Sequence, residues 1–309
     1  MSRSLKAHLL LLAVVFVWGA TFALVKSALA DISPLLFNLL RMLLASLCLG
    51  LLYRRHIGRI RRPALISGAI TGLCLATGYQ FQTAGLRLTT PSKSAFITGL
   101  VVVIVPLLLI VPVLRPAGTH APRWNAYLGA SIAFAGILLL TTPAHAGFDF
   151  TSIHIGDLLT LGCSIAFSFH MLALAHFSPR VPFEQLAVLQ VSFAALFMAI
   201  SLLLFEHPFV HWTPRVLIAL LIAALLATAV AFTVQSWAQQ YIPATHTALL
   251  LTMEPVFAWI TSFIFLGERL GLRSTLGAVL ILAGITLTEL LPQRIQPTAH
   301  EAASLAEET

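Results

Sequence analysis

The sequence LGASIAFAGI at residues 128–137 recurs as LGAVLILAGI at residues 276–285, and this pair of stretches decides how the chain is organised. Both begin with L-G-A and end with A-G-I, at identical internal spacing and 148 residues apart. Other fragments recur in the same order at nearly the same shift: LAT at 75–77 returns at 226–228, and Pro34, which opens an apolar run, is matched by Pro182. Several ordered matches across most of the chain indicate a duplication.

The apolar runs around these stretches are long enough to cross a bilayer. Of 309 residues, 59% are hydrophobic and 9% are charged, whereas soluble domains carry about 25% charged residues. A membrane-spanning helix needs about 20 apolar residues, and only helices or closed barrels satisfy their backbone polar groups inside lipid. We therefore predict an all-α membrane protein with ten transmembrane helices, at residues 7–30, 34–53, 63–86, 92–114, 124–142, 156–177, 182–205, 214–241, 244–266 and 272–291.

The ten predicted spans divide into two halves of five, at residues 7–142 and 155–291, followed by a polar tail at 292–309 that we expect to be disordered. Because five is odd, the second copy enters the membrane from the opposite face. The two halves are then inverted repeats, related by a pseudo-two-fold axis in the membrane plane. Inverted repeats of this kind are typical of transporters, which bind substrate near the midplane between the halves.

The distribution of lysine and arginine predicts the orientation. A single short loop holds Arg54, Arg55, Arg59, Arg61 and Arg62. With the N-terminus inside, the inner side carries eleven lysines and arginines and the outer side six, which favours both termini in the cytoplasm and a multi-pass protein of the cell (inner or plasma) membrane. The net charge of +7 therefore reads as an orientation signal, and we expect no nucleic-acid partner.

Neither a cofactor nor a metal is expected. The three cysteines, Cys48, Cys74 and Cys163, lie inside apolar runs and form no CxxC pair. His207 and His211 are four residues apart, but Pro208 between them places both in a loop. We predict no catalytic residue and no metal ligand.

Four motifs in order resemble one known family. They are WGATF at 18–22, SKSAFITGL at 92–100, ALLLTMEPV at 248–256 and LGERL at 266–270. Over residues 7–291 the chain resembles the drug/metabolite transporter superfamily, specifically its EamA-type family of two tandem five-helix units. The resemblance implies proton- or gradient-driven export or exchange of amino acids, metabolites or toxic compounds. Arg115, where a second Gly-Glu is expected, and Ile165, near the position that matches Trp18, depart from the pattern.

Glu254 is the sharpest candidate for a site residue because charges inside membrane spans are costly. It is expected mid-span, beside Pro255, which frees a backbone carbonyl one turn back. Two roles are open for Glu254. It binds a proton or a cationic group of the substrate, or it holds the shape of a broken helix.

Further candidates have similar pairs of interpretations. Lys93 and His246 occupy matching places in the repeat and either face the two mouths of a cavity or extend to lipid headgroups. Arg41, inside the second span, either pairs with an anionic substrate or satisfies backbone carbonyls. His170 and Gln235 either face the same cavity or pack in the core. Of Gln80 and Gln82 only one can face the cavity, because residues two apart on a helix diverge, and we take Gln80 as the candidate.

Trp18 and Trp259 are expected to form walls of the cavity or to pack in the helix interfaces. The glycines of the A-G-I motifs either permit close helix packing within the chain or form a homodimer face, so monomer and homodimer both stay open. An intramembrane enzyme acting on a lipid-borne or small substrate is the alternative function. It would need a nucleophile with a base, or clustered ligands, that the sequence does not display. A channel and a passive scaffold fit an inverted duplication less well.

Overall fold

The computed structural model describes residues 3–55, 57–58, 60–115, 124–141, 154–178, 180–238, 250–251 and 253–290, and all the regular elements there are helical. The first half contains α1 (Arg3–Ala28), α2 (Pro34–Tyr53), α3 (Arg62–Leu88), α4 (Pro91–Thr98), α5 (Val101–Leu108), the 3-10 turn η1 (Pro112–Leu114) and α6 (Trp124–Thr141). The second half contains α7 (Ile155–Phe177), α8 (Phe183–Phe205), α9 (Pro214–Leu221), the π-helix η3 (Ile222–Val230), α10 (Ala231–Ala238), α12 (Glu254–Leu266) and α13 (Leu272–Leu290). The polar tail and residues 244–249 of the ninth predicted span lie outside the described residues.

Seven helical stretches of the described chain are long and apolar enough to cross a membrane. Three further apolar helices are shorter, at Trp124–Leu140, Glu254–Leu266 and Leu272–Leu287. The all-helical prediction is confirmed at this level, whereas the count of ten crossings stays a prediction.

The fourth predicted span, 92–114, is shorter in the structure: the apolar stretch runs from Pro91 to Leu108 and consists of two helices. The chain forms α4 and α5 with turns at Gly99 and Leu100 between them, and α5 ends at Leu108. Proline lacks the N–H that continues a helix, and Pro106 and Pro112 both lie near this end.

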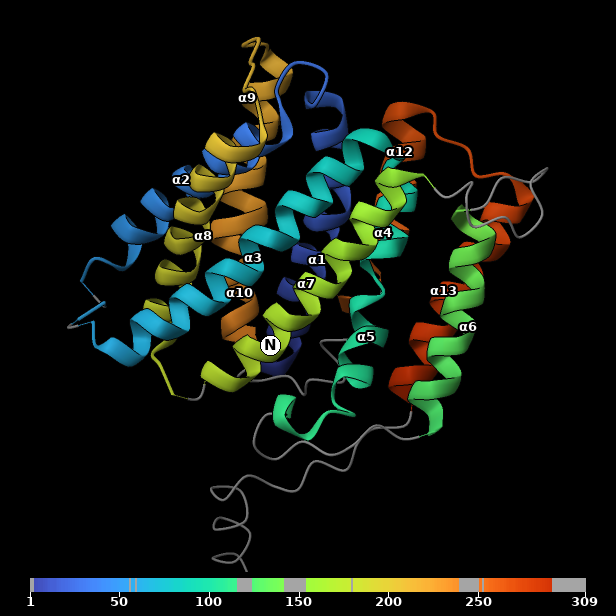
Figure 1. Ribbon diagram of the computed structural model, residues 1–309, viewed down its shortest axis with the longest axis horizontal. Helices are drawn as coiled ribbons and strands as arrows, with labels where there is room; N and C mark the ends of the chain where they lie inside the picture. Colours follow the sequence, from blue (N-terminus) through green and yellow to red (C-terminus); the bar gives the residue numbers. More distant parts are fainter. Residues whose placement is uncertain are drawn as a thin grey trace, which may run out of the picture.

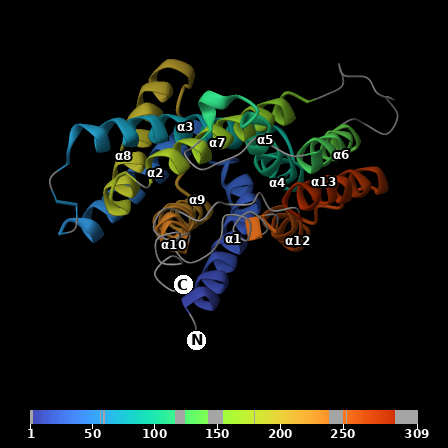
Figure 2. The ribbon, with the colours of Figure 1, turned by 90° about the horizontal axis from the view of Figure 1, so that it is seen from below.

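Contacts between the two halves occur in matching pairs. Helix α1 packs on α12 and α10, and α7, its counterpart in the repeat, packs on α4, α5 and α3. The α3–α8 contact is matched by the contact of α2 with η3, while α2–α8 and α6–α13 join counterparts directly. Helices α6 and α13 lie side by side at one edge of the bundle (Figure 1). Seen from below, α3, α7 and α8 lie above α1, α10 and α12 (Figure 2). Exchanging the halves thus leaves this set of contacts unchanged.

Glycines set how closely these helices approach. A methyl group on Gly136 would lie 2.6 Å from the carbonyl oxygen of Gly277, and one on Gly284 would lie 2.5 Å from that of Gly129. The motifs of residues 128–137 and 276–285 therefore pack against one another within the chain, as expected for small residues at membrane helix interfaces. This use of the glycines agrees with the first of the two alternatives given for them.

Candidate functional site

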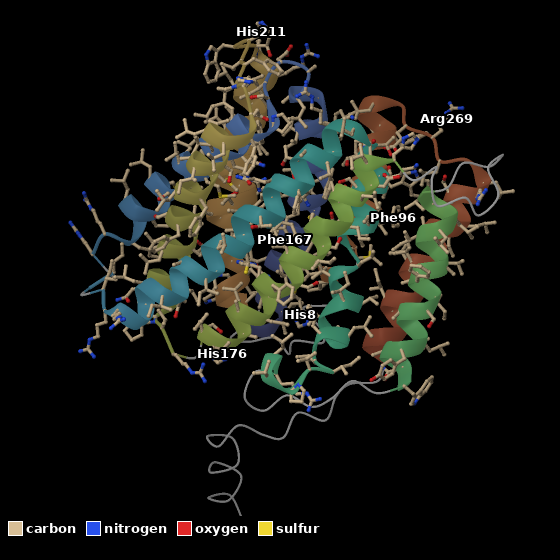
Figure 3. All side chains as sticks on the ribbon, in the orientation of Figure 1. His8, Phe96, Phe167, His176, His211 and Arg269 are labelled. Carbon is tan, nitrogen blue, oxygen red and sulfur yellow. The ribbon has the colours of Figure 1, made fainter. Side chains whose placement is uncertain are left out.

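A cavity of about 140 Å³ lies among the helices of both halves and is the candidate site. An apolar cavity of about 150 Å³ holds one benzene molecule, so this space suits a small metabolite. The first half lines it with Trp18, Thr21, Phe22, Arg41, Leu75, Tyr79, Gln82, Thr98, Gly99, Val101 and Val102. The second half lines it with Phe167, His170, Met171, Leu174, Phe232, Gln235, Leu251 and Glu254. Figure 3 shows Phe167 about midway between His211 at one end of the bundle and His176 at the other.

Arg41, on α2, is only 4% exposed and is held in place from two sides. Its Nε donates a hydrogen bond to Oγ1 of Thr228 at 2.8 Å, and its Nη2 donates to the Tyr79 hydroxyl at 3.0 Å. The guanidinium carbon also lies 4.1 Å from the centroid of the Tyr79 ring, within cation–π range. No carboxylate of the described residues pairs with Arg41. A cation in this position is thus available to an anionic group.

Glu254 is the first residue of α12, preceded by Met253 and followed by Pro255. Glu254 thus lies at the start of α12, inside the ninth predicted span at residues 244–266. A helix N-terminus carries a partial positive charge and stabilises a nearby carboxylate. No described residue donates a hydrogen bond to the Glu254 carboxylate, and none forms an ion pair with it. The carboxylate is thus an unengaged acceptor in the cavity wall.

The π-helix η3 supplies an unusual acceptor beside the cavity. Nε1 of Trp18 donates to the carbonyl oxygen of Ala227 at 2.8 Å, and Nη2 of Arg41 reaches the same oxygen at 3.4 Å. Widened π-helical segments occur frequently at functional sites because they alter the backbone hydrogen-bonding pattern. Ala227 and Thr228 belong to the recurring LAT fragment, so this fragment anchors the site from the second half.

Aromatic side chains form much of the wall between Arg41 and the other helices. The rings of Tyr79 and Phe167 meet edge to face with centroids 5.2 Å apart, and those of Trp18 and Phe232 lie 6.0 Å apart. His170 also faces Phe232 at 6.3 Å and forms a 2.9 Å hydrogen bond through Nε2 with Oε1 of Gln190 on α8. This part of the wall is therefore largely aromatic.

A second group of polar residues lies at one end of the bundle. We call it the polar cluster; it comprises Lys26, Thr89, Ser92, Lys93, Asp157 and Glu268. A wider cavity of about 470 Å³ lies beside it.

Lys93 and Asp157 form the only ion pair of the polar cluster, at 3.8 Å, among the residues that the structure describes. Oδ1 of Asp157 accepts a hydrogen bond from Oγ1 of Thr89 at 2.5 Å. The Glu268 carboxylate accepts from the backbone N–H and the hydroxyl of Ser92, at 3.2 and 2.8 Å, and from the hydroxyl of Ser262. These contacts join α4 to α7 and to the loop between α12 and α13.

Lys26, at the end of α1, binds the end of α3. Its Nζ donates to the carbonyl oxygens of Leu86, Arg87 and Thr89, at 2.8–2.9 Å. The last carbonyls of a helix have no partner within the helix, so a cation there satisfies them. The polar cluster thus ties four helices together at this end.

The structure brings five predicted residues to the central cavity: Trp18, Arg41, His170, Gln235 and Glu254. It places the other described candidates elsewhere. Lys93 belongs to the polar cluster, Trp259 is 37% exposed on α12, and Gln80 does not line the cavity. His246 lies outside the described residues.

The sequence predictions passed over Tyr79 and favoured Gln80, although Gln82 is the glutamine in the cavity. The spacing of residues along α3 is the sequence signal that identifies Tyr79 and Gln82. Leu75, Tyr79 and Gln82 are spaced by four and three residues and therefore share one face of α3, from which Gln80 diverges. Among the described residues, no three His, Cys, Asp or Glu side chains are grouped to hold a metal ion.

Comparisons with known proteins agree with this arrangement. The model of the EamA-like transporter family matches the chain twice, at residues 5–142 and 154–290. An uncharacterized transporter of Archaeoglobus fulgidus is 31% identical over 297 residues, covering 93% of this chain and 87% of the relative. The uncharacterized transporter YoaV of Bacillus subtilis is 26% identical and covers 91% and 95%.

A solved crystal structure shares the fold with a TM-score of 0.66, at 21% identity, and covers 96% of this chain and all of its own. Together with the apolar helices, the matches describe a multi-pass membrane protein whose family acts on small molecules. Because the family model covers both halves, the chain belongs to the EamA-like transporter family.

Proposed function

We propose that the chain is a secondary transporter that exports or exchanges a small metabolite, amino acid or toxic compound by alternating access. The observation that carries this proposal is the central cavity, which both matched halves line and in which Arg41 and Glu254 stand without a carboxylate or a cation as partner among the described residues. Charged groups buried at membrane depth mark substrate or ion pathways.

Alternating access follows from the proposed inverted repeat of ten spans. The matching pairs of contacts between the halves support a pseudo-two-fold relation, because exchanging the halves leaves them unchanged. In transporters of this type the two halves rock about a fixed central site. With both termini in the cytoplasm, the polar cluster lies at the outer end. The cavity extends the other way, toward Leu174 of α7 and Gln235 of α10.

We further propose that Glu254 couples transport to protons. A carboxylate that binds either a proton or a cationic group of the substrate links the two by competition. The other titratable or charged groups that line the cavity are Arg41, Tyr79 and His170. His170 already shares a hydrogen bond with Gln190, whereas Glu254 has no donor among the described residues.

The test of the transport function is counterflow in proteoliposomes that contain the full chain. Vesicles are preloaded with an unlabelled compound, and transient accumulation of the labelled compound is measured across metabolites, amino acids and toxic cations. A carrier gives an overshoot, and a channel gives none. A chemically altered product with no overshoot for any compound would instead favour the intramembrane enzyme.

The proposed topology has its own test. Reporter fusions at Gly118 and Gly147, one in each loop that flanks the fifth predicted span, are expected to report opposite sides of the membrane. The same side at both positions contradicts the five-plus-five arrangement.

A further inference from the structure

The loop between α2 and α3, at residues 54–62, contains five arginines. The structure describes four of them: Arg54 and Arg55 follow the end of α2, and Arg61 and Arg62 lie at the start of α3. All four side chains are exposed, and no guanidinium group among them forms a hydrogen bond or an ion pair with a described residue. Their charge is therefore available to a partner outside the chain.

Contacts with α8 hold this loop in place. Nε2 of Gln185 donates a hydrogen bond to the carbonyl oxygen of Ile57, and the backbone N–H of Ile57 donates to the carbonyl oxygen of Tyr53 at 3.0 Å. The ring of Tyr53 meets that of Phe183 edge to face, with centroids 6.0 Å apart. Membrane orientation requires only the charge of such a loop, whereas a binding site requires charges at fixed positions. The contacts with α8 supply that second condition.

The positive charge extends to the neighbouring turn between α7 and α8. Val181, in this turn, packs against Ala64 of α3, and Arg180 directly precedes it. Glu184 is the acidic residue in the first turn of α8, where the helix N-terminus offsets part of its charge. The surface around the loop is therefore positive and attracts an anionic partner.

The matching loop of the second half, between α8 and α9, has a different charge. Residues 206–213 include no lysine or arginine. Their one carboxylate, that of Glu206, accepts hydrogen bonds from the backbone N–H groups of Leu35 and Leu36 at the start of α2. With both termini in the cytoplasm, the arginines thus face the inner leaflet, whose anionic lipids attract basic segments.

Exposed apolar side chains continue from the arginines along both helices. Leu51 and Leu52, near the end of α2, are each 59% exposed, and Leu65 and Ile66, near the start of α3, are 42% and 47% exposed. Helices α2 and α3 pack against each other, so these apolar side chains flank one loop. A phospholipid has the same order of chemistry, with a phosphate group in the interfacial region and hydrocarbon beneath it.

We propose that the α2–α3 loop is a binding site for anionic phospholipids of the inner leaflet. The guanidinium groups at the two ends of the loop bind lipid phosphates, for which their planar fork is suited. The acyl chains lie against the exposed apolar side chains of α2 and α3. None of the four arginines lines the central cavity, so this site is independent of what the cavity transports.

The experiment measures lipid binding to the purified full chain in neutral detergent. Phosphatidylglycerol and phosphatidylcholine with the same acyl chains are titrated separately, and bound lipid is counted by native mass spectrometry. We expect phosphatidylglycerol to bind at least tenfold more tightly, because each basic residue near an anionic lipid surface contributes about fivefold. The preference is expected to fall as salt is added, since salt screens exposed charges.

Charge variants assign the site to the loop. The double variants Arg54→Gln with Arg55→Gln, and Arg61→Gln with Arg62→Gln, are each expected to weaken phosphatidylglycerol binding by about 25-fold and to leave phosphatidylcholine binding unchanged. The corresponding Arg→Lys variants keep the charge without the fork and are expected to retain part of the preference. Should a double variant fail to fold, Arg55→Gln and Arg62→Gln carry the test singly, each with a loss of about fivefold.

The matched control is Arg215→Gln with Arg269→Gln, which removes two exposed charges elsewhere. Arg269 lies at the end of the bundle opposite to His176 of α7 (Figure 3). The control is expected to bind phosphatidylglycerol as the parent chain does. If it loses as much binding as the loop variants, the lipid responds to net charge alone and the proposal is wrong.

Inorganic phosphate separates a lipid site from a site for a soluble anion. We expect phosphate, at the concentration that gives saturation with lipid, neither to raise the thermal midpoint nor to displace phosphatidylglycerol. If it does both and the loop variants abolish the effect, the arginines bind a soluble anion and the lipid proposal is wrong. Equal binding of phosphatidylglycerol and phosphatidylcholine overturns it as well.

Discussion

The guanidinium carbon of Arg41 lies over the aromatic ring of Tyr79, 4.1 Å from the ring centroid, while the Tyr79 hydroxyl accepts a 3.0 Å hydrogen bond from Nη2 of Arg41. Tyr79 therefore orients the charge that we assign to substrate binding. It does so through two separable interactions, one with the ring and one with the hydroxyl.

Tyr79→Phe keeps the ring and removes the hydroxyl. Because one hydrogen bond to a charged group is worth about 1.5–3 kcal/mol, we expect transport affinity to fall by roughly tenfold or more while the cation–π contact remains. Tyr79→Leu removes both contacts and is expected to lower affinity further. Concentration dependence of counterflow measures both. Equal affinity in all three proteins would show that Tyr79 does not orient Arg41 for binding.

Gly277→Ala tests the packing of α13 on α6. The added methyl group would lie 2.6 Å from the carbonyl oxygen of Gly136, so the helices must separate. We expect destabilisation of about 1–3 kcal/mol, seen as a lower thermal midpoint in detergent. Gly50→Ala is the control, because nothing lies within 4 Å of its added methyl group and alanine favours a helix. An unchanged midpoint for Gly277→Ala would contradict the close approach.

The polar cluster is expected to hold its end of the transporter closed. Lys93→Met breaks the ion pair with Asp157, and Glu268→Gln weakens the contacts with Ser92 and Ser262. Cys163, which is buried and lies 3.8 Å from Oγ1 of Thr98, serves as the reporter after Cys48 and Cys74 are replaced by serine. We expect both variants to raise the labelling rate of Cys163 by a membrane-impermeant maleimide several-fold.

The control for this prediction is a second ion pair, Arg215 with Asp31 at 3.2 Å, between the start of α9 and the turn before α2. Arg215→Gln is expected to leave the labelling rate of Cys163 unchanged. If it raises the rate as much as Lys93→Met does, loss of charge at this end loosens the protein generally, and the polar cluster is no gate.

Glu254→Gln tests proton coupling. We expect the variant to keep its fold, judged by a monodisperse elution profile, but to lose the pH dependence of counterflow, because glutamine cannot exchange a proton. Glu184→Gln on α8 is the matched control and is expected to keep the parent profile. A variant profile that follows the parent chain would leave Glu254 a structural role at the start of α12.

The rarity of charged side chains inside apolar runs explains which candidate residues the sequence identifies. Arg41, Glu254 and His170 stand out because charged and titratable groups are rare inside apolar runs. The face of each helix was harder to assign, as Gln80 and Trp259 show. Inside a membrane span both faces are apolar, one toward protein and one toward lipid, so the contrast that orients a helix in a soluble protein is absent.

The sequence by itself determined the helical class, the duplication into two halves and the family, since each rests on composition or on local motifs in fixed order. Only the tertiary structure decided that the recurring motifs at 128–137 and 276–285 pack on one another, and that Arg41 and Glu254 share a cavity without pairing. Residues so far apart in the chain meet through helix crossings, and those depend on how small and large side chains of two different helices interlock. No local sequence pattern specifies how the side chains of two distant helices interlock.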